Sequence, residues 1–416
     1  MTHIIKYITL LLLLLPGLLR AQGPVLPLDT ILQRIDQNNL LLQSYRFKAE
    51  SYRLNADAAT AWMAPMVGAG TFMTPYPRQN VMDDRDKGSL MLQLEQDIPN
   101  PAKQQAKRRY IASQGNVEAA GRAVTLNDLK ARARQLYYTW LVAKQRITVL
   151  EENSKIMRTM KKIEEVRYPY NQSQLGNVFK ADAKIEENAN MVRMQEGLIA
   201  KARAWLNSLM DRPGNEPFEI DSVAPPEFVP AAAFDTAALA VARKDVFKMD
   251  ESIRSMQLNI ESMRQEKKPD FKVRFDHMQP LGNMMPKAFS AMGMVSIPIA
   301  PWSSRMYRSG IKAMQQDVEA MRWERAAMLQ ETQGMLYGMQ YEIRSMQRRI
   351  AAMEEKIVPS LRRALEAAFL NYQENRLSLP EVIDAWEALT MMELNVLDEK
   401  LKRYEMIVSY EKELYR

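Results

Sequence analysis

The sequence predicts a mainly α-helical fold with a small β part, organised as two tandem copies of one plan. Three observations predict this fold: an internal repeat, two very long stretches that lack proline, and short segments in which apolar and polar residues alternate. The repeat comes first, because it determines how many times each structural element should occur. We therefore expect each copy to contain a helix, a β-hairpin, a long helix, a tip turn and a further helix.

The repeat is clearest in a motif that occurs late in each copy. Residues 168–181 and residues 372–385 both read YxxNxxxLxxVxxA. Upstream, LEQDIPNPAKQQAK (94–107) matches VSIPIAPWSSRM (295–306), and each segment ends a predicted strand at a pair of prolines and then begins a helix. The predicted boundaries are a first repeat at 22–210, a proline-rich acidic linker at 211–235, and a second repeat at 236–416.

Each copy contains one stretch suited to an exceptionally long helix. No proline occurs from 102 to 168 or from 302 to 358, and charged and apolar residues follow helical spacing throughout. Such helices reach roughly 100 Å at about 1.5 Å per residue. Isolated helices of this kind are marginal in water, so they must pack on neighbours.

Apolar residues at steps of three and four predict the seams along which these helices pack. One seam consists of Leu239, Ala242, Val246, Met249, Ile253, Met256, Ile260 and Met263. The other consists of Ile311, Met314, Val318, Met321, Met328, Met335, Met339, Met346 and Met353. Thioethers suit soft metals, but a metal site needs several ligands at one point, so we interpret the methionine column as packing on a single seam.

Two hairpins are predicted, at 66–74 with 88–97 and at 270–278 with 289–298. In DFKVRFDHM (270–278), apolar side chains and His277 occupy one face and charged side chains the other. In an exported protein this alternation fits the wall of a β-barrel between lipid and water, and a soluble sheet packed on a core is the alternative. Four strands cannot close a barrel and open edges do not persist in lipid, so several chains would share one barrel.

Export itself is predicted by residues 1–21, which we interpret as a signal peptide because Lys6 precedes an apolar run that ends before Ala21. After its removal, no run of about 18 apolar residues remains to form a membrane-spanning helix.

The composition excludes several classes of protein. The chain has 416 residues, a formal charge of +7, no cysteine, two histidines and 30 methionines. Disulfides, thiolate metal sites and cysteine nucleophiles are therefore excluded. No nucleophile, base or metal cluster stands at workable spacing, so we expect neither an enzyme nor a cofactor. The positive charge is spread too evenly to indicate nucleic-acid binding.

With these features, the chain resembles the TolC-like outer-membrane efflux protein family. The tandem copies, the proline turn from strand to helix and the motif YxxNxxxLxxVxxA carry the resemblance, which covers essentially the whole mature chain. It implies a homotrimer whose shared β-barrel, with four strands per chain, crosses the lipid of the outer membrane. It also implies that the long helices continue as a coiled-coil tunnel, giving a cell outer membrane protein with a large periplasmic part.

The resemblance implies partners and contact residues as well. The implied partners are a periplasmic adaptor protein and an inner-membrane pump, for which the RND type is one option. The implied adaptor-contact residues at the two tips are Tyr168, Asn171, Leu175, Tyr372, Asn375 and Leu379, and packing of the helix turns is their alternative role. The family usually has glycine where Asn171 and Asn375 stand, and asparagine is the next-best residue for a left-handed helix end.

Two further groups are candidates for function. Glu381 and Asp384 lie three residues apart on one helical face, at positions where related channels place carboxylates around a closed entrance. Three copies of this pair would form a negative constriction, and solvated surface is the alternative. The weaker candidates, for a soft-metal site at the barrel, are His277, Met278, Met292 and Met294.

The function that these expectations favour is the passive exit duct of a tripartite efflux pump that exports drugs or metal ions. The outer-membrane duct of a type I protein secretion system is one alternative. A periplasmic coiled-coil scaffold that never enters the membrane is another.

Overall fold

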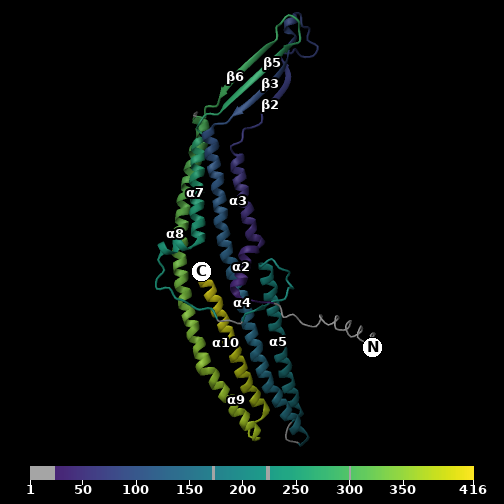
Figure 1. Ribbon diagram of the computed structural model, residues 1–416, viewed down its shortest axis with the longest axis vertical. Coiled ribbons are helices and arrows are strands. Elements are labelled where there is room, and N and C mark those ends of the chain that lie inside the picture. Colours follow the sequence, from purple (N-terminus) through teal and green to yellow (C-terminus); the bar gives the residue numbers. More distant parts are fainter. Residues whose placement is uncertain (1–23, 171–173, 222–224, 299–300) are drawn as a thin grey trace, which may run out of the picture. The chain divides into compact units, whose positions relative to one another are not determined.

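The order helix, two strands, long helix, helix occurs twice along the chain (Figure 1). The computed structural model describes residues 24–416 apart from 171–173, 222–224 and 299–300, so the predicted signal peptide at 1–21 lies outside the described residues. The helices are α2 (Leu28–Asn38), α3 (Leu40–Ala58), α4 (Pro101–Arg167), α5 (Leu175–Leu209), α6 (Thr236–Ala242), α7 (Lys244–Gln265), α8 (Pro301–Ala352), α9 (Val358–Gln373) and α10 (Leu379–Glu413). The strands are β1 (Val25–Leu26), β2 (Met66–Phe72), β3 (Ser89–Ile98), β4 (Glu219–Ile220), β5 (Phe271–Pro280) and β6 (Ala288–Val295).

The chain forms two compact units. The sheet unit comprises residues 43–124 and 240–331, and the tip unit comprises residues up to 42, 125–239 and 332–416. Each unit thus combines segments from both predicted repeats. Among the helices that the structure describes, none is both long and apolar enough to cross a membrane.

Both long proline-free stretches are helical, as predicted. α4 begins at Pro101 and continues for 67 residues, and α8 begins at Pro301 and continues for 52 residues. Proline is favoured at a helix start because the first N–H groups have no acceptor within the helix and the fixed φ of proline already suits the helix.

The helical path does not stop where the second proline-free stretch ends, at Val358. Residues Met353–Ile357 form a π-helical turn, and α9 follows directly from Val358 with Pro359 in its first turn. The π-helical turn shifts the hydrogen-bond register, which lets a residue without an N–H sit inside a continuous helical path. That path reaches Gln373 before it turns.

The methionine column follows a single seam only in part. Ile253, Ile260 and Val318 form a small core with Met314 and Met321 packed against it, as predicted. After Met321 the buried positions become Leu329, Thr332 and Leu336, whereas Met335 is 39% exposed. Consecutive steps of four move the buried stripe around the helix, so the prediction that all these methionines share one seam is wrong.

The seam predicted along 239–263 contains one break. Ala242 is exposed and the neighbouring Arg243 is buried. α6 ends at Ala242, and Arg243 has extended backbone before α7 begins. The Arg243 guanidinium is paired with Asp245 at 2.5 Å, which compensates the charge that this break buries.

Both predicted hairpins form, and they join into one antiparallel sheet in the order β2-β3-β5-β6 (Figure 1). The register places Leu94 opposite Phe275, and Glu95 opposite Arg274. Because side chains alternate between faces, one face carries Leu90, Leu92 and Leu94 with Phe271, Val273 and Phe275, all exposed. The other face carries charge, including Lys272 with Glu95 at 2.5 Å and with Asp97 at 3.2 Å.

The linker at 211–235 contains structure that its composition did not indicate. β4 lies within it and pairs in parallel with β1 through Leu26 and Ile220. Phe218 is buried, with its ring centroid 5.2 Å from that of Trp140 on α4. These contacts make the linker part of the main core of the tip unit.

A second part of the linker, the strap (residues 231–234), is fixed through its backbone. Ala231 and Phe234 each donate a backbone N–H to a tyrosine hydroxyl and accept a bond from a glutamine amide. The partners are Tyr410 (3.2 Å) and Gln340 (3.0 Å) for Ala231, and Tyr337 (3.4 Å) and Gln333 (2.6 Å) for Phe234. The strap therefore ties α8 to α10 within the tip unit.

Candidate functional site: the helical tips

The turn between α9 and α10, the second tip, is built around a left-handed residue. Asn375 has φ of 59°. Its N–H donates to the Tyr372 carbonyl at 3.1 Å, and the N–H of Arg376 donates to the Asn371 carbonyl at 2.8 Å. This pair of bonds is the Schellman motif that satisfies the last carbonyls of a helix. Asn375 therefore has the helix-ending conformation expected of it, and Asn171 lies outside the described residues.

Tyr372 is the centre of a buried polar contact between the second tip and α4. Its hydroxyl donates a hydrogen bond to the carboxylate of Glu164. The guanidinium of Arg167 lies 4.7 Å from the Tyr372 ring centroid and donates to the carbonyls of Tyr372 and Gln373 at 3.2 and 3.0 Å. We call Glu164, Arg167 and Tyr372 the tip latch. Burial, followed by the hydrogen bond to Glu164 and its charge, raises the pKa of the Tyr372 hydroxyl well above its ordinary range.

Of the two predicted entrance carboxylates, Glu381 has a structural role in this chain. Its carboxylate accepts hydrogen bonds from the Ser378 hydroxyl at 2.7 Å and from the backbone N–H of Ser378 at 2.9 Å. The backbone bond is one half of the capping box at the start of α10, and the other half runs from the backbone N–H of Glu381 to the Ser378 side chain. Both bonds to the carboxylate lower the pKa of Glu381, the hydroxyl bond more than the backbone bond. Asp384 is exposed. The structure thus places both carboxylates on the surface of α10, with Glu381 already engaged.

The two tips bury equivalent residues to very different degrees. Tyr372 is 2% exposed and Leu379 is 1% exposed, whereas their counterparts Tyr168 and Leu175 are 45% and 44% exposed. The exposed set at the first tip, which we call the first-tip patch, is Val166, Tyr168, Tyr170, Leu175 and Phe179. Equivalent motif positions therefore pack in one copy and lie on the surface in the other. Phe179 is absent from the predicted contact residues, although its place four residues after Leu175 on α5 could have indicated it.

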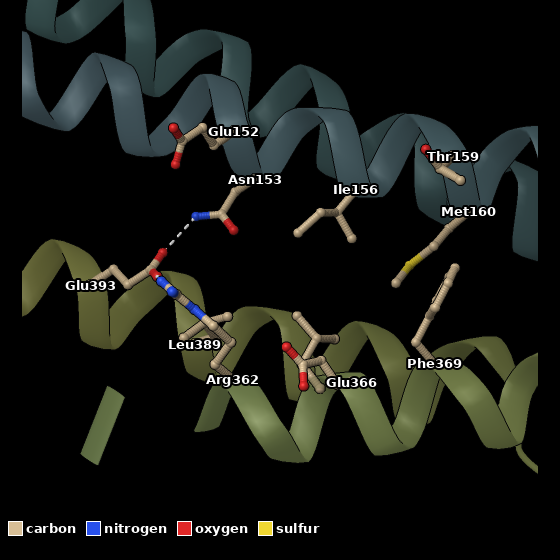
Figure 2. A pocket seen from close by; sticks show the side chains of 11 residues that line it. Glu152, Asn153, Ile156, Thr159, Met160, Arg362, Glu366, Phe369, Leu389 and Glu393 are labelled. Atoms are coloured by element: carbon tan, nitrogen blue, oxygen red, sulfur yellow. Dashed lines mark hydrogen bonds and ion pairs between the residues drawn. The ribbon is translucent and has the colours of Figure 1, made fainter. Parts of the chain in front are cut away.

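A groove lies close to the second tip, and no sequence motif indicates it. It has a volume of about 480 Å³ and runs between α4, α9 and α10 (Figure 2). Its apolar lining consists of Ile156, Met160, Leu365, Phe369 and Leu389. At one end, Glu393 accepts hydrogen bonds from Asn153 at 3.0 Å and from Arg362 at 2.8 Å.

The four candidates for a soft-metal site are not brought together. The register places Met292 opposite Arg274 and Met294 opposite Lys272, so these methionines share the charged face with Met278. His277 lies opposite Phe289 and Leu92, on the apolar face. Met278 pairs with Ala288, four residues from Met292, a separation of roughly 13 Å along a strand. Among the described residues, no group of three or more histidine, aspartate or glutamate side chains is arranged to hold a metal ion.

Comparison with solved structures shows which fold this is. No protein-family model matches the chain, and no curated protein matches it. CusC, from a structural study of folding and transmembrane channel formation, matches with a TM-score of 0.74 and 16% identity over 93% of this chain and 91% of that chain. The outer-membrane protein VceC of Vibrio cholerae matches with a TM-score of 0.69 and 14% identity over 93% and 95%. The outer-membrane channel CmeC of Campylobacter jejuni matches with a TM-score of 0.71 and 13% identity over 93% and 85%.

The chain has the fold of these outer-membrane channels over nearly its whole length. The resemblance to TolC-like proteins that the sequence motifs indicate is therefore confirmed at the level of the fold. The predicted fold class is confirmed in the same sense, because the chain is mainly helical with a four-stranded sheet.

Proposed function

We propose that this protein is the exit duct of a tripartite efflux pump in the outer membrane. The observation that carries the proposal is the four-stranded sheet, in which one face is exposed and apolar and the other is charged. A sheet in water buries its apolar face, whereas a barrel wall turns that face to lipid and its polar face to the lumen. Three chains, each supplying four strands, would close such a barrel without leaving an edge in lipid.

The charged face would line the lumen of this barrel. There Lys272 pairs with Glu95 and Asp97, and Arg274 pairs with Asp276 at 2.9 Å. Paired charges keep the lumen hydrated but give it little net charge, so it would not strongly prefer cationic over anionic cargo. We favour organic cargo over soft metal ions, because His277 and Met278 lie on opposite faces of the sheet.

The helical tips would form the periplasmic entrance and its docking surface. The tip latch ties the end of α9 to the end of α4 within one protomer, so opening at this point requires the Tyr372–Glu164 bond to break. The first-tip patch is the apolar surface that an adaptor protein would cover. Exposed aromatic and aliphatic side chains in one patch are typical of protein–protein contacts.

The test is to express the full chain, separate the membranes on a density gradient, and reconstitute the purified protein in a planar lipid bilayer. The proposal predicts an outer-membrane protein that migrates as a heat-sensitive trimer and gives discrete conductance steps. Recovery in the soluble periplasmic fraction, without conductance, would instead establish a coiled-coil scaffold. Efflux of dyes and detergents by a deletion strain, with and without the chain, then tests the assignment to a pump.

A further inference from the structure

The groove beside the second tip has the features of a small-molecule site. Its volume of about 480 Å³ falls within the range of known ligand pockets, roughly 300–1,000 Å³. Most of its floor is apolar and includes the flexible side chain of Met160 and the ring of Phe369, which lie close to each other in Figure 2. A neighbouring hollow of about 560 Å³ shares Glu152, Arg362, Glu366 and Glu393 with it. A ligand longer than a single ring system therefore has room to extend along the helices.

The glutamate side chains around the groove differ in whether they have a partner of opposite charge. Glu393 is already neutralised by Arg362 and bonded to Asn153. Glu152 on α4 and Glu366 on α9 lie on opposite walls of the groove (Figure 2). Within the described part of the chain, neither of these two exposed carboxylates takes part in an ion pair. The lining therefore carries two unpaired negative charges above an apolar floor.

We propose that this groove binds hydrophobic organic cations, meaning amines or quaternary ammonium ions attached to an apolar body. The apolar body would cover the floor of the groove and remove that surface from water. The cationic head would lie between Glu152 and Glu366, and the apolar body would reach Met160 and Phe369 at the other end of the groove (Figure 2). Anions of the same size are disfavoured by the uncompensated carboxylates.

Binding would act on the helices that the tip latch also joins. The groove takes its walls from α4 on one side and from α9 and α10 on the other. A bound cation that contacts both walls stabilises the observed spacing of these helices, by an amount that grows with the ratio of its free concentration to its Kd. This inference concerns binding to the tip unit and does not depend on which cargo the duct carries.

The experiment uses the full chain in nanodiscs of phosphatidylcholine, titrated with rhodamine 6G, a fluorescent hydrophobic cation, and followed by fluorescence polarisation against empty discs. We expect saturable binding to the wild type. The double substitution E152Q with E366Q should raise the Kd at least tenfold. The matched control E151Q with E196Q removes the same charge from exposed positions that do not line the groove, and it should change the Kd less than twofold.

Three further measurements complete the test. Thr159→Trp should fill the groove and abolish binding, while fluorescein, an anion of similar size, should not bind the wild type. The chain has no cysteine, so Thr159→Cys gives a single thiol whose labelling by a water-soluble maleimide reports whether the groove is open. The proposal is overturned if binding does not saturate, or if both double variants lose binding equally. It is also overturned if the maleimide fails to label the introduced thiol at position 159, because a second copy or another partner then covers the groove.

Discussion

The hydroxyl of Tyr372 donates a hydrogen bond to the carboxylate of Glu164, and this bond joins residues 208 positions apart in the sequence. Both side chains are 2% exposed. A buried carboxylate is stable only when it is hydrogen-bonded or paired, so the bond holds the end of α9 against α4 and at the same time satisfies Glu164. This contact lies beside the turn that we propose as part of the entrance.

Replacing Tyr372 with phenylalanine should destabilise the tip unit and favour an open entrance. The substitution keeps the ring but leaves a buried carboxylate without one of its donors, which costs about 1–3 kcal/mol. We expect a lower thermal midpoint and a larger mean conductance in a planar bilayer. Tyr168→Phe is the matched control, because its ring is 45% exposed, and it should change neither quantity. Equal effects of the two substitutions would show that the tip latch has no special role.

The turn at Asn375 should accept glycine and resist alanine. Its φ of 59° lies in the left-handed region, where a residue with an ordinary side chain is disfavoured by roughly 1–2 kcal/mol. We therefore expect Asn375→Gly to unfold at the same or a higher temperature than the wild type, and Asn375→Ala at a lower one. Asn371, an exposed asparagine inside α9, provides the control, since there glycine should destabilise. A loss at Asn375→Gly equal to that at Asn371→Gly would contradict the assigned turn.

Neighbouring residues of β3 should respond in opposite ways to a charge. Leu92 lies on the apolar face of the sheet and Gln93 on the charged face. If the apolar face meets lipid, Leu92→Lys should cost about 2–4 kcal/mol at mid-membrane depth and reduce the amount recovered in the outer membrane. Gln93→Lys should leave that amount unchanged, as measured by immunoblot of gradient fractions. Loss of both variants, or of neither, would argue against a membrane-facing sheet.

The core of the tip unit should limit the stability of the protein in alkali. Burial raises the pKa of Tyr138 from its ordinary value to about 12, with the nearby Glu411 carboxylate acting in the same direction. Because the pKa of Tyr138 is higher in the folded state than in the unfolded state, the unfolded chain loses this proton more readily once the pH exceeds about 10. The free energy of unfolding is therefore unaffected below about pH 10 and falls as the pH rises towards 12. Tyr138→Phe removes the ionisable group, so its alkaline unfolding midpoint should move upward.

The control for this prediction is Tyr341→Phe, which changes a tyrosine that is exposed on α8. Circular dichroism of both variants between about pH 9 and pH 12.5, a range that brackets the ordinary and raised tyrosine pKa values, gives the comparison. Tyr404, whose ring centroid lies 5.5 Å from that of Tyr138, also has its pKa raised by burial, so the midpoint should shift without the alkaline transition disappearing. Midpoints that coincide for the wild type and Tyr138→Phe would contradict the prediction.

The elements that the sequence predicted correctly are those that depend only on the local pattern of residues. The predicted hairpins include all four strands of the sheet, and the absence of proline located α4 and α8. The same alternation rule separates His277 from Met278, because neighbouring residues in a strand point to opposite faces. Applied strictly to residues 270–278, that rule alone excludes a soft-metal site that uses both of these side chains.

Tertiary packing decided the features that the sequence did not reveal. The motif YxxNxxxLxxVxxA is identical at 168–181 and 372–385, yet only Tyr372 has Glu164 beside it. The continuation of the helix through Pro359 depends on the π-helical turn before it, which no composition rule indicates. The groove at the second tip arises from three helices whose residues are far apart in sequence, so no single segment carries a signal for it.

The outer strands of the sheet have a consequence for how this protein must be made. β2 and β6 end the sheet, so among the described strands each has a partner on one side only. Their unpaired backbone groups would bind any extended chain that came near, and bare lipid cannot satisfy them. If the protein forms the trimeric barrel that we propose, a newly made chain therefore has to remain shielded until strands from other copies reach it. The proposed function thus constrains assembly as well as transport, because one chain would supply only four strands of the wall.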